Sequence, residues 1–238
     1  MDEPYEYKFC SLASTRLAYL EKGSGDVLLL LHGNGENSGY FRFQLEYFSR
    51  FFRVIAVDSR GHGKSERGTG ELTLQKIADD LLAFMNKLSI DKANILGFSD
   101  GGNIALLFAL KHQDRIRRLV VNGANLNPSG VLGIFQTGVV IEHALLSLPA
   151  RKSKKALLKR EILSLMIDQP NLTSNQLSGI TVPTLVLAGT HDVIKRRHTE
   201  KIFAYLPVSR LCFLPGDHMI ARNNPDEFNK TVYDFLTE

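Results

Sequence analysis

The chain has 238 residues, of which 44% are hydrophobic and 23% charged, and its formal net charge is +4. This composition is ordinary for a globular protein, and the length allows one large α/β domain or two small ones. No apolar run approaches the roughly 20 residues that span a bilayer, and the N-terminal MDEPYEYKF has acids where a signal peptide has lysines, so we expect a cytoplasmic protein with no membrane span.

The first predicted strands are two segments, 5–12 and 15–21, that alternate apolar and polar residues. They predict a hairpin that turns at Ala13 and Ser14. Continuous apolar runs follow, each ending in a polar loop that carries glycine, which is typical of strands covered on both faces. These runs lie within 26–33, 52–63, 92–99, 116–124 and 183–192.

Segments with a helical spacing of apolar residues separate these runs. They are 41–52, 73–88 with Thr73 as the predicted N-cap, 103–111, and 225–236 with a proline at its start. Strands that alternate with helices predict an α/β fold, with a mostly parallel central sheet flanked by helices.

One long stretch interrupts this alternation. Between the run that ends near Asn125 and the run that begins near Thr184, the sequence has helical patterns and no strong strand. The stretch is too long for a simple crossover. We therefore predict a small helical cap over one end of the sheet at 126–182, with 1–125 and 183–238 forming the core.

The predicted cap contains a strongly basic run. The segment RKSKKALLKR at 151–160 has six basic residues and no acid. Such a run can attract nucleic acid or anionic lipid. Because neither interleaved aromatic residues nor a nucleic-acid-binding motif accompanies it, we interpret it as a solvated helix face and expect no nucleic-acid partner.

The two cysteines, Cys10 and Cys212, lie far apart in the sequence and in no metal-binding pattern. Both stand among apolar neighbours, so we interpret them as buried thiols of a protein in a reducing compartment. We expect neither a disulfide nor a bound metal.

Polar residues follow the apolar runs where a ligand site is expected, because ligands of open α/β sheets bind at the carboxyl ends of the strands. These positions are the His32-Gly33-Asn34-Gly35 loop, Asp58, Ser99 with Asp100, and Asp192. The sequence therefore predicts a site at this edge of the sheet.

The segment Gly97-Phe98-Ser99-Asp100-Gly101 matches G-x-S-x-G, a tight strand-to-helix turn that holds a serine hydroxyl clear of the backbone. The turn is strained for a residue with a side chain, and glycines on both sides remove the Cβ atoms that would collide. The following helix points its free N–H groups at the reacting group. Ser99 is the candidate nucleophile; the other interpretation is a glycine-rich turn with a capping serine.

Five motifs, LLLHGNG, DSRGHGKS, GFSDGG, LAGTHDVI and GDHMI, stand in the order found in the α/β-hydrolase fold family. The chain resembles this family over nearly its whole length. Its GFSDGG, VVNGANLN and DEFNKTVYDFL segments are similar to the valacyclovir-hydrolase (biphenyl-hydrolase-like) branch, which also resembles the ring-cleavage-product hydrolases.

The resemblance implies a catalytic triad of Ser99, Asp192 and His218, in the family order of nucleophile, acid and base. Asp192 follows a late strand in LVLAGTHDVI, and His218 precedes the final helix in LPGDHMIARNNP. Asp217 is the weaker competitor for the acid. The other histidines are expected to have structural roles.

Two backbone N–H groups are needed to stabilise the oxyanion, and the resemblance assigns them to Asn34 and Asp100. Because this chain has HG-N-G where relatives often have HG-G-G or HG-x-P, Gly35 stays an alternative to Asn34. The Asp100 side chain has two interpretations: a favourable charge at a helix N-terminus, worth under about 1 kcal/mol, or a substrate-binding carboxylate that holds an ammonium group.

These features predict a serine hydrolase that cleaves small carboxylic esters through an acyl-enzyme, with amino-acid esters as a candidate subclass and no metal or organic cofactor. The expected partner is a small-molecule ester, and the expected state is a monomer or homodimer. Three alternatives stay open: C–C bond hydrolysis of ring-cleavage diketones, perhydrolysis as a side activity, and a non-catalytic ligand receptor or scaffold on the same fold.

Overall fold

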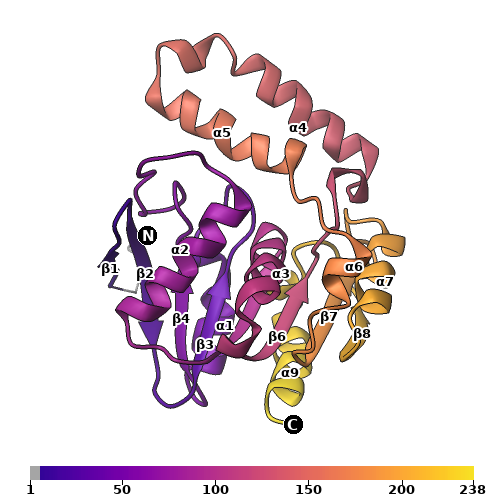
Figure 1. The fold of residues 1–238 in the computed structure, drawn as a ribbon. Coiled ribbons are helices and arrows are strands. Elements are labelled where there is room, and N and C mark those ends of the chain that lie inside the picture. The colour runs from indigo at the N-terminus through magenta and orange to yellow at the C-terminus, as the bar shows by residue number, and fades with distance from the viewer. Residues whose placement is uncertain (1–5) are drawn as a thin grey trace.

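One eight-stranded sheet organises the computed structural model, which describes residues 6–238 (Figure 1). Its strands are β1 (Lys8–Ser11), β2 (Arg16–Lys22), β3 (Val27–Leu31), β4 (Arg53–Val57), β5 (Ala93–Phe98), β6 (Ile116–Asn122), β7 (Thr184–Gly189) and β8 (Ser209–Leu214). Their order across the sheet is β1-β2-β4-β3-β5-β6-β7-β8. The pairs β1–β2 and β2–β4 are antiparallel and the other neighbours are parallel, so the predicted α/β fold class is confirmed.

The predicted N-terminal hairpin is confirmed. Strands β1 and β2 pair directly, and the N–H of Leu12 closes the turn by donating to the carbonyl of Thr15 at 2.8 Å. Because β2 also pairs with β4, the hairpin extends the parallel part of the sheet at one edge.

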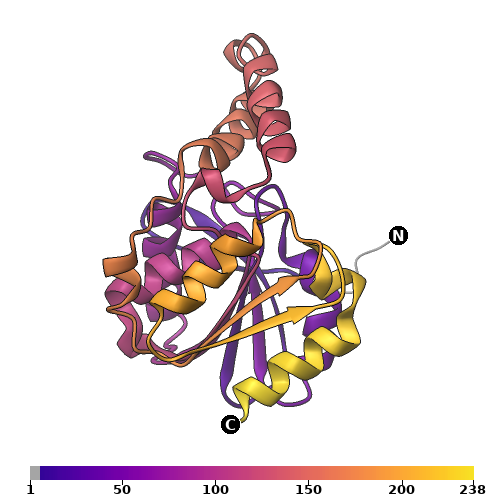
Figure 2. The ribbon, with the colours of Figure 1, turned by 90° about the vertical axis from the view of Figure 1, so that its right-hand side faces the viewer.

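Helices cover both faces of this sheet. The helices of residues 6–238 are α1 (Arg42–Phe48), α2 (Leu74–Lys87), α3 (Asp100–His112), α4 (Gly133–Leu145), α5 (Lys154–Asp168), α6 (Ser174–Leu177), α7 (Arg196–Tyr205), α8 (Ile220–Asn223) and α9 (Pro225–Leu236), with short 3-10 turns η1 (Ser38–Phe41), η2 (Gln113–Arg115), η3 (Pro128–Gly130) and η4 (Pro149–Arg151). Helices α1, α8 and α9 pack on one face, and α2, α3, α6 and α7 on the other (Figure 2). This double burial explains the continuous apolar runs of the central strands.

The helix predictions hold with two differences in length. Thr73 caps α2 as predicted, since its hydroxyl accepts the N–H of Lys76 at 3.0 Å, and α9 spans the predicted 225–236. Helix α3 begins three residues before the predicted 103–111, because Ser99 is the single residue between β5 and α3 and occupies the N-cap position of the helix.

The helix predicted over 41–52 is shorter than expected. The chain turns after Phe48, whose carbonyl accepts the N–H groups of both Phe51 and Phe52 at 2.9 Å. This turn redirects the chain into β4, so the apolar residues after Phe48 belong to the turn and not to α1.

The stretch predicted as a cap contains α4 and α5, which run antiparallel to each other above the carboxyl ends of the strands (Figures 1 and 2). Helix α6 packs against α7 instead, and its Leu177 joins the hydrophobic core. We therefore keep the division into a cap at 126–182 and a core at 1–125 and 183–238 as a proposal. Among residues 6–238, no helix combines the length and apolar character that crossing a membrane requires.

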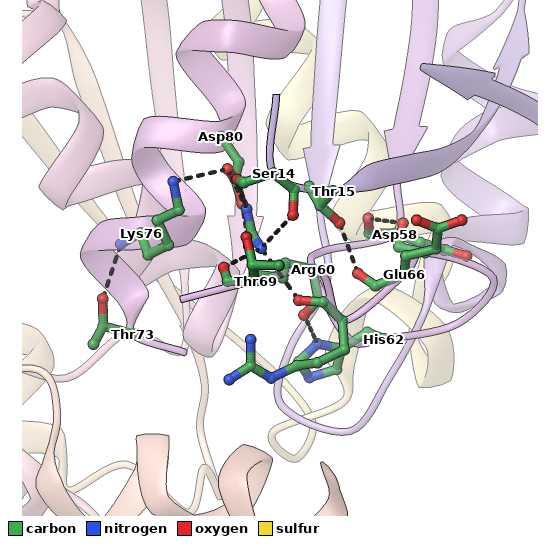
Figure 3. Close-up of polar contacts among 12 residues, drawn as sticks. Ser14, Thr15, Asp58, Arg60, His62, Glu66, Thr69, Thr73, Lys76 and Asp80 are labelled. Carbon is green, nitrogen blue, oxygen red and sulfur yellow. Dashed lines mark hydrogen bonds and ion pairs between the residues drawn. The ribbon is translucent and has the colours of Figure 1, made fainter. Parts of the chain in front are cut away.

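A buried arginine fastens the loop between β4 and α2. Arg60 donates through Nε and Nη2 to the two carboxylate oxygens of Asp80 on α2, at 2.6 and 2.8 Å (Figure 3). It also donates to the carbonyl of Thr69 at 3.1 Å and to the hydroxyl of Ser14 at 2.7 Å, so it joins this loop to the hairpin turn. Because the guanidinium is fully buried, its charge depends on the Asp80 carboxylate.

Replacing Asp80 by asparagine should strongly destabilise the protein, because the charge of Arg60 then stays buried without its counterion. We expect the free energy of unfolding, measured by urea denaturation, to fall by about 3 to 5 kcal/mol. Asp79→Asn is the matched control, since that neighbouring side chain is 48% exposed, and it should cost less than about 1 kcal/mol. Equal losses in the two variants would contradict this account of the buried pair.

Candidate active site

The turn between β5 and α3 holds Ser99 in a strained conformation, with φ of 53° and ψ of −118°. Crowding explains the glycines on either side. A Cβ atom on Gly97 would collide with the carbonyl of Gly101, and one on Gly101 with the carbonyl of Leu31 at the end of β3. The N–H of Ser99 donates to the carbonyl of Asn122 at 2.8 Å, which ties the turn to β6. The serine therefore stands at the carboxyl edge of the sheet, beside the positive end of α3.

Three side chains from separate loops form one hydrogen-bonded chain. The Nε2 atom of His218 lies 3.1 Å from the Oγ atom of Ser99, and its Nδ1 atom lies 2.6 Å from Oδ1 of Asp192. Asp192 is almost fully buried, and its Oδ1 atom also accepts the N–H of Ile194 at 2.8 Å. When Nδ1 carries the proton and donates to this carboxylate, Nε2 is free to accept the proton of the serine.

Asp217, the competing acid, binds elsewhere. Its Oδ1 atom accepts the N–H of Met219 at 2.9 Å, and its Oδ2 atom accepts the side-chain amide of Asn223, also at 2.9 Å. These bonds fix the entry to α8. Within residues 6–238, the carboxylate that is hydrogen-bonded to His218 is that of Asp192.

Gly123 makes room for the imidazole, and sequence reasoning missed it. This glycine follows β6 with φ of 63°, and a Cβ atom there would lie 2.8 Å from Cε1 of His218 and 3.4 Å from Oδ2 of Asp192. The ring of Phe98 packs on the same imidazole, with 4.8 Å between the ring centroids. The available signal was a glycine directly after an apolar run, which often marks the close approach of another group.

Asn34 and Asp100 are brought together beside Ser99, the candidate nucleophile. The Asn34 Nδ2 atom donates to Oδ2 of Asp100 at 2.9 Å and to the carbonyl of Ile162 on α5 at 2.8 Å. The loop touches the serine, since a Cβ atom on Gly33 would lie 3.1 Å from Cβ of Ser99. The backbone N–H of Asp100 belongs to the first residue of α3 and so has no acceptor within the helix. The Asn34 side chain thus joins the turn that holds Ser99 to helix α5, a role that sequence reasoning missed.

Asp100 is a buried carboxylic acid at the edge of the site. Burial raises its pKa above the ordinary value, while hydrogen bonds from the side chains of Asn34 and Asn103 and the nearby imidazole of His218 act in the opposite direction. Within residues 6–238, no lysine or arginine contributes to this shift. The site therefore holds a buried carboxyl group whose neighbouring basic side chain is the His218 imidazole and not a lysine or arginine.

The pocket beside Ser99 has a volume of about 30 Å³, which is room for about one water molecule. Its lining includes Ser99, Asp100 and His218 at the edge of the sheet and Val131, Met166 and Gln169 from the segment 126–182. Helix α5 is held over this pocket by a two-pronged ion pair between Arg67 and Glu161, at 2.8 and 2.9 Å. A group much larger than a water molecule can therefore reach Ser99 only if lining side chains such as those of Val131, Met166 and Gln169 move aside.

Asp58, also predicted at this edge, stabilises the scaffold. Its two carboxylate oxygens accept the backbone N–H groups of Ser38 and Lys64, each at 2.7 Å. These bonds fold the loop after β4 against the loop after β3. Among the described residues, no cluster of three histidine, cysteine or acidic side chains could hold a metal ion.

His32 is a buried neutral imidazole in the loop after β3. Its Nδ1 atom donates to the carbonyl of Gly33 at 2.8 Å, and its Nε2 atom accepts the N–H of Ser59 at 3.0 Å. Burial, with a smaller effect of the neighbouring His62 ring, lowers the pKa of His32 to about 3. The ring therefore holds the loop that leads to Asn34 without adding charge to the site.

The chain is similar to known proteins in three comparisons: with a family model, with relatives in sequence and with solved structures. A family model described as alpha/beta hydrolase fold matches residues 26–140. Serine hydrolase BPHL of Homo sapiens is 30% identical over an alignment of 244 positions, gaps included, which covers 93% of this chain and 83% of that protein. The enol-lactonase from Burkholderia xenovorans LB400 superposes with a TM-score of 0.82 at 27% identity, covering 97% of this chain and all of its own. Est816, described as an N-acyl homoserine lactone degrading enzyme, superposes with a TM-score of 0.79 at 25% identity, covering 96% and 100%.

The low pKa of His32 predicts a pH dependence of stability. The folded value of about 3 lies below the unfolded value of about 6.5, so unfolding takes up one proton between them. This stabilising contribution is complete above the unfolded pKa and is lost as the pH falls toward the folded one, at about 1.4 kcal/mol per pH unit. Between about pH 6 and pH 4, the free energy of unfolding of His32→Gln, measured in urea, should fall less steeply with decreasing pH than that of the wild type. The difference in slope should be about 1.4 kcal/mol per pH unit. Identical slopes in the variant and the wild type would contradict the assignment, whatever the difference in absolute stability.

Proposed function

This chain belongs to the α/β-hydrolase family, and from that premise we propose that it cleaves small carboxylic esters through an acyl-enzyme formed on Ser99. Family membership and the similarity to a serine hydrolase support hydrolysis by an activated serine. The observation that carries the proposal is the continuous hydrogen-bonded chain from Ser99 through His218 to Asp192. A serine hydroxyl is a weak nucleophile, and this arrangement is what activates it.

In the acylation half, Ser99 Oγ attacks the carbonyl carbon while its proton moves to Nε2 of His218. Asp192 holds the imidazole in the tautomer with the proton on Nδ1 and stabilises the cation that forms. The backbone N–H groups of Asn34 and Asp100 donate to the oxyanion. His218 then returns the proton to the departing alkoxide, so an alcohol leaves and an ester bond to Ser99 remains.

In the deacylation half, water takes the place of the alcohol. His218 accepts a proton from the water as its oxygen attacks the acyl carbon, and the same N–H groups stabilise the second oxyanion. When this intermediate collapses, His218 protonates Ser99 Oγ. A carboxylic acid leaves, and the free hydroxyl is restored.

Two similarities support an ester over other bonds. The enol-lactonase and the lactone-degrading enzyme are both named for substrates that are cyclic esters. A panel of activated esters with different chain lengths, assayed beside a ring-cleavage diketone, separates ester hydrolysis from C–C hydrolysis. Turnover of the diketone without turnover of any ester would contradict the proposal.

Amino-acid esters are the subclass that the pocket favours. Asp100 lines the pocket next to Ser99, is buried, and has no lysine or arginine partner among the described residues. A substrate ammonium group placed there would supply the missing cation and favour the ionised form of the carboxyl. The Asn34 side chain holds the carboxylate in place for this contact.

Loss of any member of the hydrogen-bonded chain should remove activity without unfolding the protein. We expect Ser99→Ala and Asp192→Asn each to lower kcat by about ten-thousand-fold or more on an activated ester, the second because the imidazole loses its tautomer. Asp217→Asn, the matched control on the neighbouring loop, should keep kcat within about threefold, since Asp217 does not touch the imidazole.

Covalent labelling checks the same claim independently of the choice of ester. A fluorophosphonate probe should label the wild type and not Ser99→Ala. Failure of Ser99 to react in the folded wild type would favour the receptor or scaffold alternative.

The Asp100→Asn variant tests the amino-acid subclass. We compare kcat/KM for an alanine ester and a propionate ester of the same alcohol, because these substrates differ only in the ammonium group. The variant should lose about 10- to 100-fold more activity on the alanine ester, which is the size of one charge-assisted hydrogen bond. An unchanged ratio would contradict ammonium binding and would leave ester hydrolysis itself intact.

A further inference from the structure

Helix α4 presents an apolar surface to solvent. None of its residues is buried, and the side that faces away from the core carries large apolar side chains. We call them the apolar stripe: Ile134 (80% exposed), Phe135 (51%), Ile141 (55%), Leu145 (72%) and Leu148 (71%). Apart from Phe135, their spacing of seven, four and three residues keeps them on one side of the helix and of the turn that follows it.

The apolar stripe differs from the single exposed apolar residues that occur on most protein surfaces. Single exposed apolar residues are normal, whereas contiguous groups mark interaction sites. The acid of α4, Glu142, is paired with Lys159 of α5, so no unpaired acid interrupts the apolar stripe. The α4–α5 pair also stands out above the rest of the molecule, where a flat partner could meet it (Figures 1 and 2).

The chain turns from the apolar stripe directly into four exposed cations. We call Arg151, Lys152, Lys154 and Lys155 the basic cluster. Within residues 6–238, none of the four forms an ion pair with a protein acid. Lys154 and Lys155 occupy the first turn of α5, where acids are favoured and cations are disfavoured by the helix dipole. At this position, Lys154 and Lys155 therefore do not stabilise the helix itself.

We propose that the apolar stripe and the basic cluster together form a docking face for an anionic lipid surface. Exposed apolar side chains beside lysine and arginine are the two features by which a helix lies on such a membrane. The apolar side chains enter the boundary between headgroups and acyl chains, and the cations bind lipid phosphates. Neither feature requires hydrolysis, so this proposal stands apart from the function proposed above.

Two other partners, a second copy of this chain and nucleic acid, fit the charge and apolar character of this face less well. A second copy of this chain would offer the basic cluster no free acid from the same face, because the segment 126–160 contains Glu142 as its one acid. Nucleic acid would neutralise the basic cluster but leave the aliphatic side chains of the apolar stripe in water, because bases stack on aromatic rings and Phe135 is the single ring of the stripe. An anionic bilayer satisfies both parts of the face.

The test is co-sedimentation of the full chain with vesicles. One set contains phosphatidylcholine alone, and the other contains equal parts of phosphatidylcholine and phosphatidylglycerol. The wild type should bind the anionic vesicles more tightly, and added salt should weaken this binding because it screens the attraction.

Two variants separate the contributions. Lys154→Gln with Lys155→Gln should lower the partition coefficient on anionic vesicles by about 30-fold. Leu145→Gln with Leu148→Gln should lower it on the order of tenfold. All four side chains are exposed, so both variants should keep the thermal stability of the wild type.

Matched changes at the opposite end of the sheet serve as controls. Lys87→Gln with Lys92→Gln removes the same charge, and Val208→Gln replaces an exposed apolar side chain. These variants should bind as the wild type does.

Each other outcome overturns the proposal. An equal loss of vesicle binding in the control variants would show that net charge, and not this face, determines the binding. Absence of binding to anionic vesicles would remove the lipid partner. A wild-type dimer in analytical ultracentrifugation that becomes monomeric in Leu145→Gln with Leu148→Gln, without vesicle binding, would identify the face as a contact between copies of this chain.

Discussion

The close approach of α3 to β3 and β5 is the constraint on which the site depends. Side chains at Gly97 and Gly101 would collide with backbone carbonyls, so the turn closes only around glycine at both positions. Closing it places Ser99 in a strained conformation at the carboxyl edge of the sheet, beside the start of α3 and the loop after β3. The parallel strands β7 and β8 then bring the loops that carry Asp192 and His218 to the same edge.

The site contains few charged side chains, and hydrogen bonds hold these side chains in place. His32 is neutral, and the Asp192 carboxylate is buried and hydrogen-bonded to both His218 and the N–H of Ile194. Asp100 is the one acid of the pocket that lacks a fixed cation among the described residues. Because the side-chain amide of Asn34 donates to both the Asp100 carboxylate and the carbonyl of Ile162 on α5, this one side chain connects the turn that holds Ser99 with helix α5.

The sequence predicted features that depend on neighbours in the chain. The apolar runs, the hairpin, the Thr73 cap and the G-x-S-x-G turn are local patterns, whereas the pairing of Asp192 with His218 came from resemblance to a family and not from spacing. Contacts between distant positions had no pattern to reveal them: Asn34 reaches Ile162 across 128 residues, and Gly123 makes room for a ring far along the chain. The end of α1 was missed because apolar residues continue through the turn. Periodicity also could not tell which side of α4 is left uncovered, which is why the basic run alone predicted only a solvated face.

The central claim is that Ser99 forms a covalent acyl intermediate. The most direct measurement is intact-protein mass spectrometry after acid quenching of the protein during turnover of an activated ester, followed by mapping of the modified peptide. The account predicts a mass increase equal to one acyl group on the peptide that contains Ser99, and none in Ser99→Ala. Turnover without such an adduct, or an adduct on another residue that persists in Ser99→Ala, would contradict it.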